Sequence, residues 1–338
     1  MIISQTPFRI SFFGGGTDYP AYYKEHGGTV LATTIDKYCY ITCRYLPKFF
    51  EHSSRLVYSK TELVNSIDEI KHPAIRECLR FMKITKGVEI HHDADLPARS
   101  GLGSSSSFTV GLLHALYALK GQMPSKMTLA RDAIHIEQDL IGEHVGSQDQ
   151  CNAAFGALNR ISFNGNHEID VRPIIISNDK LKMLQNHLVI FYTGISRTAS
   201  DIAAEQIKKT PERYKELKII GEMVDYSIDI LKSRIDRMDD FGKLLHEGWM
   251  LKRSLTNKIS NDHIDQIYER ARNSGALGGK LLGAGSGGFM VFYIRPENKN
   301  KLIESLKSLL HVPFRFEFLG SRIIYYRPQE EVGYKDAI

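Results

Sequence analysis

A glycine turn that leads directly into a serine-rich helix constrains this sequence more than any other feature. Residues 96–107 read LPARSGLGSSSS, and an amphipathic helical pattern follows through Lys120. The first N–H groups of a helix have no intrahelical acceptor and carry the positive end of the helix dipole. Glycine removes the side chains that would keep an anion away from them. The turn at Gly101 and Gly103, followed by Ser104–Ser107, therefore predicts a phosphate cradle.

A serine N-cap after an ordinary loop is the alternative interpretation of the same residues. One serine is enough to cap a helix, whereas four follow one another here. The repetition favours the phosphate cradle.

Two further glycine clusters lie at Gly14–Gly16 and Gly278–Gly288. The cluster at Gly278–Gly288 contains Lys280, but Leu281 follows this lysine where a Walker motif needs serine or threonine. A G-x-G-x-x-G string occurs at positions 283, 285 and 288, but it precedes a predicted strand instead of opening a helix. Neither a Walker site nor a dinucleotide fold is therefore expected.

Charge and cysteine usage exclude several classes of protein. The chain has 44 Lys and Arg against 39 Asp and Glu, a net charge of +5, and the basic residues are interspersed with acidic ones. This pattern does not indicate a nucleic-acid partner. Cys39, Cys43, Cys78 and Cys151 form no C-x-x-C pair and are expected to be reduced. With no signal-peptide pattern and no apolar run of membrane length, we expect a cytoplasmic protein without a membrane partner.

Strand and helix patterns alternate without a regular βαβ rhythm, which favours an α+β fold with helices packed on mixed, largely antiparallel sheets. A chain of 338 residues suggests two domains, at about 150 residues each. The best boundary lies near residue 165, although a plain turn is the other interpretation there. We therefore expect domains at 1–165 and 166–338. Expected strands are 2–13, 29–44 with a hairpin turn at Asp36-Lys37, 87–93, 157–163, 187–193, 280–294 after a glycine turn, and 314–326; expected helices are 61–83, 104–120, 128–141, 200–232, 241–254 and 298–310.

Together the three clusters resemble the signature of the GHMP kinases. Pro7-Phe8-Arg9-Ile10 with the glycines after it resembles the first family motif, Pro97–Ser107 the second, and Leu282–Gly288 the third. They occur in family order and at family distances, with Ser106-Ser107 where the family usually has two alanines. The resemblance implies a two-domain GHMP-kinase-like fold: an N-terminal ATP-binding domain, a ferredoxin-like C-terminal domain, and an active site in the cleft between them.

Residues 8–20, FRISFFGGGTDYP, resemble a narrower branch of the family. This branch contains the D-glycero-D-manno-heptose 7-phosphate kinases and the kinase domain of fucokinase. The resemblance implies transfer of the γ-phosphoryl group of ATP to an anomeric (C1) hydroxyl. The expected product is heptose 1,7-bisphosphate, for nucleotide-activated heptose and surface polysaccharide synthesis.

The resemblance also implies which residues hold the nucleotide and its magnesium ion. Glu137 would supply the magnesium carboxylate, although from position alone a surface glutamate is the simpler interpretation. Ser104 would contact the same Mg²⁺. The predicted ATP-binding residues are Pro97, Gly101, Leu102, Gly103, Ser104, Ser105, Ser106 and Ser107.

Asp149 is the expected general base. It lies in the segment Gly146–Gln150, which matches the family segment whose aspartate faces the attacking hydroxyl. A base of this kind contributes about 10²–10⁴ in rate. Arg9 would pair with Asp149 and keep it ionised. Taken alone, Asp149 could also be the N-cap of the helix that follows.

The remaining site predictions concern the acceptor. Asp18 and Thr17 suit vicinal sugar hydroxyls, because carboxylates and hydroxyls hydrogen-bond to them. Arg197 is the candidate for a phosphate on the substrate, since guanidinium binds phosphate in a bidentate manner, with an ordinary surface arginine as the alternative. The other predicted substrate residues are Gly15, Gly16, Thr193, Gly194, Gly283, Gly285 and Gly287.

Two other functions stay open at this point. The chain could be another small-molecule kinase of the same family, such as a fucose or other sugar 1-kinase, or a non-catalytic sugar sensor. Retention of Arg9, Glu137 and Asp149 argues against a sensor, which needs no base. The anomer is not determined by the sequence, and a homodimer is left open.

Overall fold

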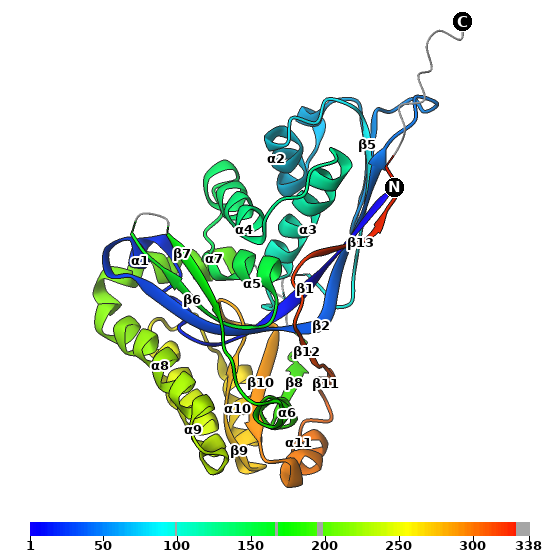
Figure 1. Ribbon diagram of the computed structural model, residues 1–338. Helices are drawn as coiled ribbons and strands as arrows, with labels where there is room; N and C mark the ends of the chain where they lie inside the picture. Colours follow the sequence, from blue (N-terminus) through cyan, green and yellow to red (C-terminus); the bar gives the residue numbers. More distant parts are fainter. Residues whose placement is uncertain (99, 166–167, 195–198, 329–338) are drawn as a thin grey trace, which may run out of the picture.

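The computed structural model describes residues 1–98, 100–165, 168–194 and 199–328. These residues form a nine-stranded sheet, a four-stranded sheet and helices that pack against both (Figure 1). Every strand pair in the two described sheets is antiparallel except that of β3 (Ser54–Val57) with β5 (Val88–Ala94). The expected α+β class with mixed, largely antiparallel sheets is confirmed.

The first sheet is built on the hairpin of β1 (Ile2–Phe13) and β2 (Gly28–Tyr45). The sequence predicts a turn at Asp36-Lys37, and this prediction is wrong because β2 runs through both residues. Asp36 instead pairs with a segment that lies far along the chain. The Asp36 amide donates to the Arg315 carbonyl over 2.9 Å, and the Arg315 amide donates to Asp36 Oδ1 over 2.7 Å. Long-range pairing therefore replaces the local turn.

Strands from later parts of the chain complete this sheet. β13 (Arg322–Tyr326) pairs with β1, and β12 (Phe316–Glu317) pairs with β2 (Figure 1). β7 (Ile169–Pro173) joins the same sheet through β6 (Leu158–Phe163). The two sheets therefore do not divide the chain at one point, and the boundary at residue 165 stays a prediction. The remaining strand, β4 (Thr61–Val64), pairs with β3.

Helices cover one face of the first sheet (Figure 1). α3 (Ser104–Leu119) contacts both β1 and β2. Gly111 permits this approach: Ser4 Oγ donates to its carbonyl over 2.8 Å, and a Cβ at Gly111 would lie 2.8 Å from Thr6 Oγ1. The other helices in the first half of the chain are α1 (Pro20–His26), α2 (Pro73–Phe81), α4 (Lys126–His135) and α5 (Gln148–Phe155).

Three expected helices are shorter than their patterns predict, and the one expected over 298–310 covers only Lys299–Ser305. The pattern at 61–83 predicts one helix, and its first half is wrong, because β4 and the 3-10 turn Ile67–Glu69 precede α2. Proline suits the first helical position and disfavours helical backbone in the residue before it, so Pro73 sets the start of α2. The pattern at 128–141 leaves α-helical geometry after His135, and Ile136–Leu140 forms a π-helical turn.

The second sheet has the strand order β11-β8-β10-β9. β9 packs so closely on α9 (Met238–Ser254) that a Cβ at Gly278 would lie 2.0 Å from the Gly242 carbonyl oxygen. The other elements of the second half are β8 (Leu188–Tyr192), β9 (Ala276–Leu281), β10 (Phe289–Ile294), β11 (Leu310–His311), α6 (Asn178–Asn186), α7 (Ala199–Lys209), α8 (Tyr214–Lys232), α10 (Asp262–Asn273), α11 (Lys299–Ser305) and the 3-10 turns Thr210–Arg213, Ile235–Arg237 and Pro296–Asn298.

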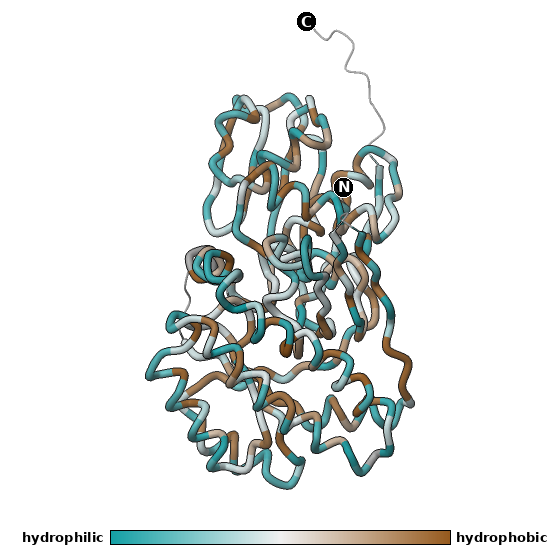
Figure 2. Tube along the Cα trace, turned by 90° about the vertical axis from the view of Figure 1, so that its left-hand side faces the viewer, coloured by the Kyte–Doolittle hydropathy of each residue, from teal (hydrophilic) through white to brown (hydrophobic). Residues whose placement is uncertain are grey.

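Helices at the surface of the molecule are amphipathic. Hydrophilic and hydrophobic residues alternate along them in Figure 2, as in helices that turn one face to a core. The helix expected over 200–232 is divided into α7 and α8 at the 3-10 turn that contains Pro211, because proline lacks the N–H of a continuous helix. None of the described helices combines the length and apolar character needed to cross a membrane.

Gly156 provides a test of the returning C-terminal segment. It has a left-handed backbone with φ 71°, and a Cβ there would lie 2.2 Å from the Leu319 carbonyl carbon. We expect Gly156→Ala to lower the free energy of unfolding by about 2–5 kcal/mol, the sum of left-handed strain and overpacking. Denaturant unfolding measures the change. The control is Gly221→Ala inside α8, where the nearest atom lies at 3.6 Å. Equal stability of Gly156→Ala and wild type would contradict the contact.

Candidate active site

A buried arginine joins the first strand to the start of α5. Arg9, on β1, donates from Nε to Asp149 Oδ1 and from Nη2 to Asp149 Oδ2, both over 2.8 Å. Its third nitrogen, Nη1, donates to the Gly101 carbonyl over 2.5 Å. The side chain of Arg9 is 5% exposed and that of Asp149 is 25% exposed. The pair predicted from the sequence is therefore formed, and the carboxylate is the member that solvent or a ligand reaches.

The second and third glycine clusters meet backbone to backbone. Gly101 and Gly283 have left-handed φ values of 83° and 81°. A Cβ at Gly101 would lie 2.3 Å from the Leu282 carbonyl oxygen, and a Cβ at Gly283 would lie 2.6 Å from the Gly101 Cα. Any side chain at either position would separate the two loops. The contact brings a loop from each sheet to one place.

The predicted phosphate cradle begins where the sequence places it, but Ser107 is already used within the chain: its amide donates to the Gly103 carbonyl and its hydroxyl to the Pro7 carbonyl, both over 2.9 Å. Gly103 is left-handed with φ 76° and immediately precedes α3. A Cβ there would lie 3.4 Å from Asp149 Oδ2, so the helix start is adjacent to the arginine–aspartate pair. Leu102 is buried, and its carbonyl accepts the Arg9 amide over 3.1 Å. Pro97 lies exposed at the beginning of the same loop.

Glu137 lies on the π-helical turn and is 1% exposed. Its Oε2 accepts hydrogen bonds from Ser106 Oγ over 2.9 Å and from Gln150 Nε2 over 2.5 Å. Its buried Oε1 makes no hydrogen bond of normal geometry with a described residue, although the Thr109 hydroxyl lies near enough to the carboxylate to lower its pKa. Burial raises the pKa of this carboxyl to about 7. An unpartnered carboxylate oxygen beside a phosphate cradle fits Mg²⁺, which takes oxygen ligands from one or two carboxylates and from phosphates.

The serine that contacts this glutamate differs from the one assigned by sequence. Ser106 bonds Glu137, whereas the assignment of the metal to Ser104 stays a prediction. Within the described residues, no three His, Cys, Asp or Glu side chains are grouped to hold a metal ion. A cation at Glu137 would therefore take its other ligands from hydroxyls, phosphate oxygens and water.

Asp18 is a second buried carboxylate in the site, 2% exposed. Its Oδ1 accepts from the Gly16 amide and its Oδ2 from Gln148 Nε2, both over 2.9 Å. A Cβ at Gly146 would lie 1.9 Å from Asp18 Oδ2, so glycine is required there. Burial raises the pKa of Asp18, an effect that Asp149 strengthens.

Two buried lysines complete the cluster, and the sequence interpretation missed both. Lys252 Nζ donates to the Gly283 carbonyl over 2.9 Å, and Lys280 Nζ donates to the Phe12 carbonyl over 3.0 Å. Burial lowers the pKa of Lys252 to about 8 and that of Lys280 well below its ordinary value. A signal was available: Lys252 follows Leu245 and Trp249 at helical spacing on the buried face of α9. A lysine at an apolar position of an amphipathic helix indicates a function.

The other residues predicted to bind the acceptor lie in different surroundings. The Thr17 hydroxyl lies within hydrogen-bond distance of the Gly14 and Thr29 carbonyls, which share its one donor, and accepts from the Thr29 amide, so it fixes the first glycine turn to β2. Thr193 bonds Gly288 through its hydroxyl and its amide. Gly194 is exposed, Gly16, Gly285 and Gly287 lie in the glycine loops, and Arg197 lies outside the described residues. Their roles toward a substrate stay predictions.

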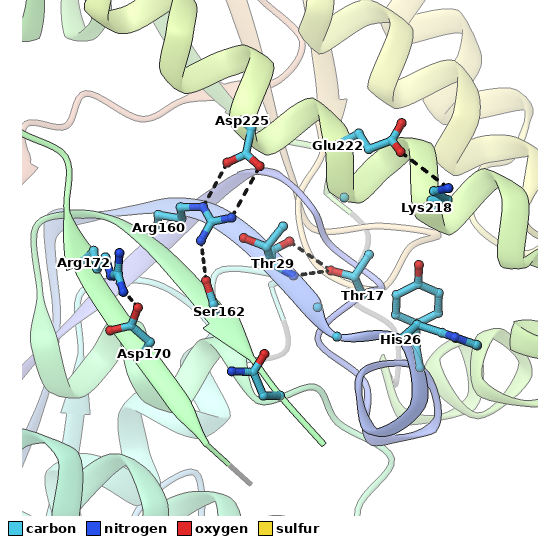
Figure 3. Close-up of a pocket in the computed structure, with 15 residues that line it drawn as sticks. Thr17, His26, Thr29, Arg160, Ser162, Asp170, Arg172, Lys218, Glu222 and Asp225 are labelled. Atoms are coloured by element: carbon cyan, nitrogen blue, oxygen red, sulfur yellow. Dashed lines mark hydrogen bonds and ion pairs between the residues drawn. The ribbon is translucent and has the colours of Figure 1, made fainter. Parts of the chain in front are cut away.

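A surface hollow of about 510 Å³ lies between β6, β7 and α8, and Thr17, one of the predicted acceptor residues, lines it (Figure 3). This hollow is not lined by Arg9, Glu137 or Asp149. Its charged side chains are paired with one another: Arg160 with Asp225, Arg172 with Asp170, and Lys218 with Glu222. Because its charges are already paired, we do not assign the reaction to it.

The burial of Glu137 makes stability depend on pH. Its pKa in the fold is about 7, above the ordinary value of 4.5, so the native state binds more protons than the unfolded state between these values. Stability from this group is therefore lost as the pH rises from about 4.5 through 7. Between pH 5 and 8, we expect wild type to lose about 2–3 kcal/mol of unfolding free energy relative to Glu137→Gln.

Denaturant unfolding without ligands or divalent cations measures this difference. Glu222→Gln, on the exposed face of α8, is the control substitution. If the unfolding free energies of wild type and Glu137→Gln change with pH in parallel, burial does not raise the pKa of Glu137.

Two family models match the chain: the GHMP kinases N terminal domain over residues 68–157 and the GHMP kinases C terminal domain over residues 230–312. A D-glycero-alpha-D-manno-heptose 7-phosphate kinase of Campylobacter jejuni is 32% identical over 318 residues, which cover 90% of this chain and 93% of that protein. A bifunctional fucokinase/GDP-fucose pyrophosphorylase of Arabidopsis thaliana is 24% identical over 324 residues, which cover 88% of this chain and 30% of that protein.

Solved structures share the fold over nearly the whole chain. A protein of Bacteroides thetaiotaomicron described as a D-glycero-D-manno-heptose 1-phosphate kinase superposes with a TM-score of 0.71 at 24% identity, covering 95% of this chain and 98% of that one. A Lactococcus lactis galactokinase complexed with galactose gives 0.71 at 16% identity, covering 95% and 94%. The family inferred from the motifs is confirmed. The chain is similar to the Campylobacter kinase over nearly its full length, and two GHMP kinase domains match it. These findings show that this chain belongs to the GHMP kinase family and is a phosphotransferase with an alcohol group as acceptor.

Proposed function

We propose that this kinase transfers the γ-phosphoryl group of ATP to the anomeric (C1) hydroxyl of a sugar. In its most specific form, D-glycero-D-manno-heptose 7-phosphate becomes the 1,7-bisphosphate, for nucleotide-activated heptose and surface polysaccharide synthesis. The observation that carries the reaction is the Arg9–Asp149 pair held on the Gly101 turn. The choice of heptose is supported by the 32% identical heptose 7-phosphate kinase.

Asp149 is the base of the proposed reaction. It accepts the proton of the acceptor hydroxyl while the new oxygen–phosphorus bond forms and the bond from the γ-phosphorus to its bridging oxygen breaks, which releases ADP. Two hydrogen bonds from Arg9 hold both carboxylate oxygens and fix the orientation of the carboxylate. An anomeric hydroxyl is more acidic than an ordinary alcohol, which eases the proton transfer.

The glycine turn and the start of α3 hold the phosphates. The leading N–H groups of α3, opened by Gly101 and Gly103, point their positive dipole end at the nucleotide. Glu137 and Ser106, with Ser104 as predicted, would hold Mg²⁺, whose charge would offset that of the phosphates. We assign ATP binding to the N-terminal part, 1–165, and the ferredoxin-like part to 166–338.

The names of the relatives leave the position of the new phosphate open. One is called a heptose 7-phosphate kinase and the other a heptose 1-phosphate kinase. An ADP-release assay over heptose 7-phosphate, heptose 1-phosphate, fucose and galactose distinguishes these acceptors, and phosphorus NMR of the product locates the ester. Turnover with fucose alone would favour the second candidate, which the fucokinase relative supports. Absence of turnover with every anomeric hydroxyl would contradict the sugar 1-kinase.

Asp149→Asn tests the base. The amide cannot accept the proton, so we expect kcat to fall by about 10²–10⁴-fold. Calorimetry should find ATP binding unchanged, because the phosphate cradle is left intact. The control is Asp225→Asn, since Asp225 is 65% exposed and pairs with Arg160 away from the site. A kcat within the range of the control would reject Asp149 as the base.

A further inference from the structure

Three hydrogen-bond donors converge on one point beside Gly15. A Cβ on this glycine would lie 3.6 Å from Lys252 Nζ, 3.8 Å from Ser11 Oγ and 3.9 Å from Gln148 Nε2. These are its nearest non-neighbouring atoms, and all three side chains are buried. They come from α9, β1 and α5, so elements on both sheets contribute. With no side chain on Gly15, the three donors surround the position that a Cβ would take.

The three groups have donors to spare. The Lys252 ammonium has three N–H groups, and its hydrogen bond to a described residue is the one to the Gly283 carbonyl. The Ser11 hydroxyl has no partner among the described residues. Gln148 Nε2 uses one of its two N–H groups on Asp18 Oδ2. Buried donors are rarely left unsatisfied, so this arrangement calls for an acceptor that the chain does not supply.

The chemistry of the three donors indicates that this acceptor is an anionic oxygen. An ammonium, a hydroxyl and an amide N–H can donate to one oxygen atom, and the Lys252 ammonium favours an oxygen that carries negative charge. Such an oxygen beside Gly15 would satisfy the open donors.

The point lies next to the reaction centre. Gln148 directly precedes Asp149, and Lys252 is bonded to Gly283, which touches Gly101 of the phosphate cradle. We propose that Lys252, Ser11 and Gln148 form an oxyanion site that binds a non-bridging oxygen of the phosphoryl group during its transfer. This inference rests on the proposed function, and it adds three residues to the reaction.

A phosphate already present on the acceptor is the other source of the same chemistry. The site adjoins Asp149, which faces the attacking hydroxyl, whereas the phosphate of a heptose 7-phosphate is attached at the opposite end of the sugar. The geometry therefore favours the transferring group. Donors aimed at developing charge act mainly on kcat, whereas donors to a ground-state phosphate act mainly on KM.

Lys252→Met removes the ammonium and keeps the length of the side chain. We expect kcat to fall by about 10²–10³-fold, with the KM values for ATP and acceptor within about threefold. Lys243→Met, on the exposed side of the same helix, is the control and should keep the wild-type kcat. If Lys252→Met fails to fold, Lys252→Ala with added alkylamines replaces it, and recovery of kcat by the amine is the expected result.

Gly15→Ala tests the open point itself. The new methyl group would meet its neighbours only at ordinary contact distances, and Gly15 is not left-handed, so the fold is kept. The methyl would occupy the place of the phosphoryl oxygen, and we expect a loss of kcat as large as that of Lys252→Met. Gly221→Ala is the control. Wild-type kcat in Gly15→Ala would overturn the proposal.

A binding measurement separates this proposal from the choice of substrate. ADP with aluminium fluoride and Mg²⁺ mimics the transferring group and needs no turnover. We expect Lys252→Met to weaken its binding by about 10²–10³-fold and that of ADP alone by less than about threefold. Equal weakening of both would overturn the proposal. So would a rise in KM confined to phosphorylated acceptors, which would assign Lys252 to the acceptor's own phosphate. Inactive wild type with every sugar would refute the proposed function alone.

Discussion

The whole site depends on a backbone contact that only glycine permits. The Gly101 turn and the Gly283 loop lie against each other with no side chain between them. The Phe289 amide donates to the Ser100 carbonyl over 3.1 Å beside this contact. Arg9 is fixed to the carbonyl on one side of it and Lys252 to the carbonyl on the other. Neutral peptide groups thus set the distance between charges that come from different sheets.

Burial is the main cause of the unusual proton affinities in this cluster. It favours the neutral forms of Asp18 and Glu137, whose pKa values are raised, and that of Lys252, whose pKa is lowered. A bound cation favours the ionised glutamate, and a bound anion favours the ionised lysine. Binding of the proposed Mg²⁺ and phosphate would therefore be linked to proton exchange, with a proton released at Glu137 and one taken up at Lys252.

Features encoded by neighbouring residues were predictable from the sequence. The glycine turn at Gly101 and Gly103 and the start of α3 at Ser104 follow from the local run of glycine and serine. The pairing of Arg9 with Asp149 joins residues 140 positions apart, and it was inferred from the family resemblance alone. The turn at Asp36 failed because its partner is Arg315, which no local pattern indicates. Lys252 was missed because burial is a property of the packed helix, although its position on the apolar face carried the signal.

The pairing of β13 with β1 has a consequence for how the protein is made. Ile2 pairs with Tyr326, so the strand that carries Arg9 is synthesised first among the described strands and keeps an unpaired edge until the last of them leaves the ribosome. Closing so long a loop adds little entropy cost, since that cost grows only with the logarithm of length. Meanwhile the open edge can pair with another nascent chain. The part of β1 that stays open in this way is Ile2–Gln5, at the start of the strand that carries Arg9.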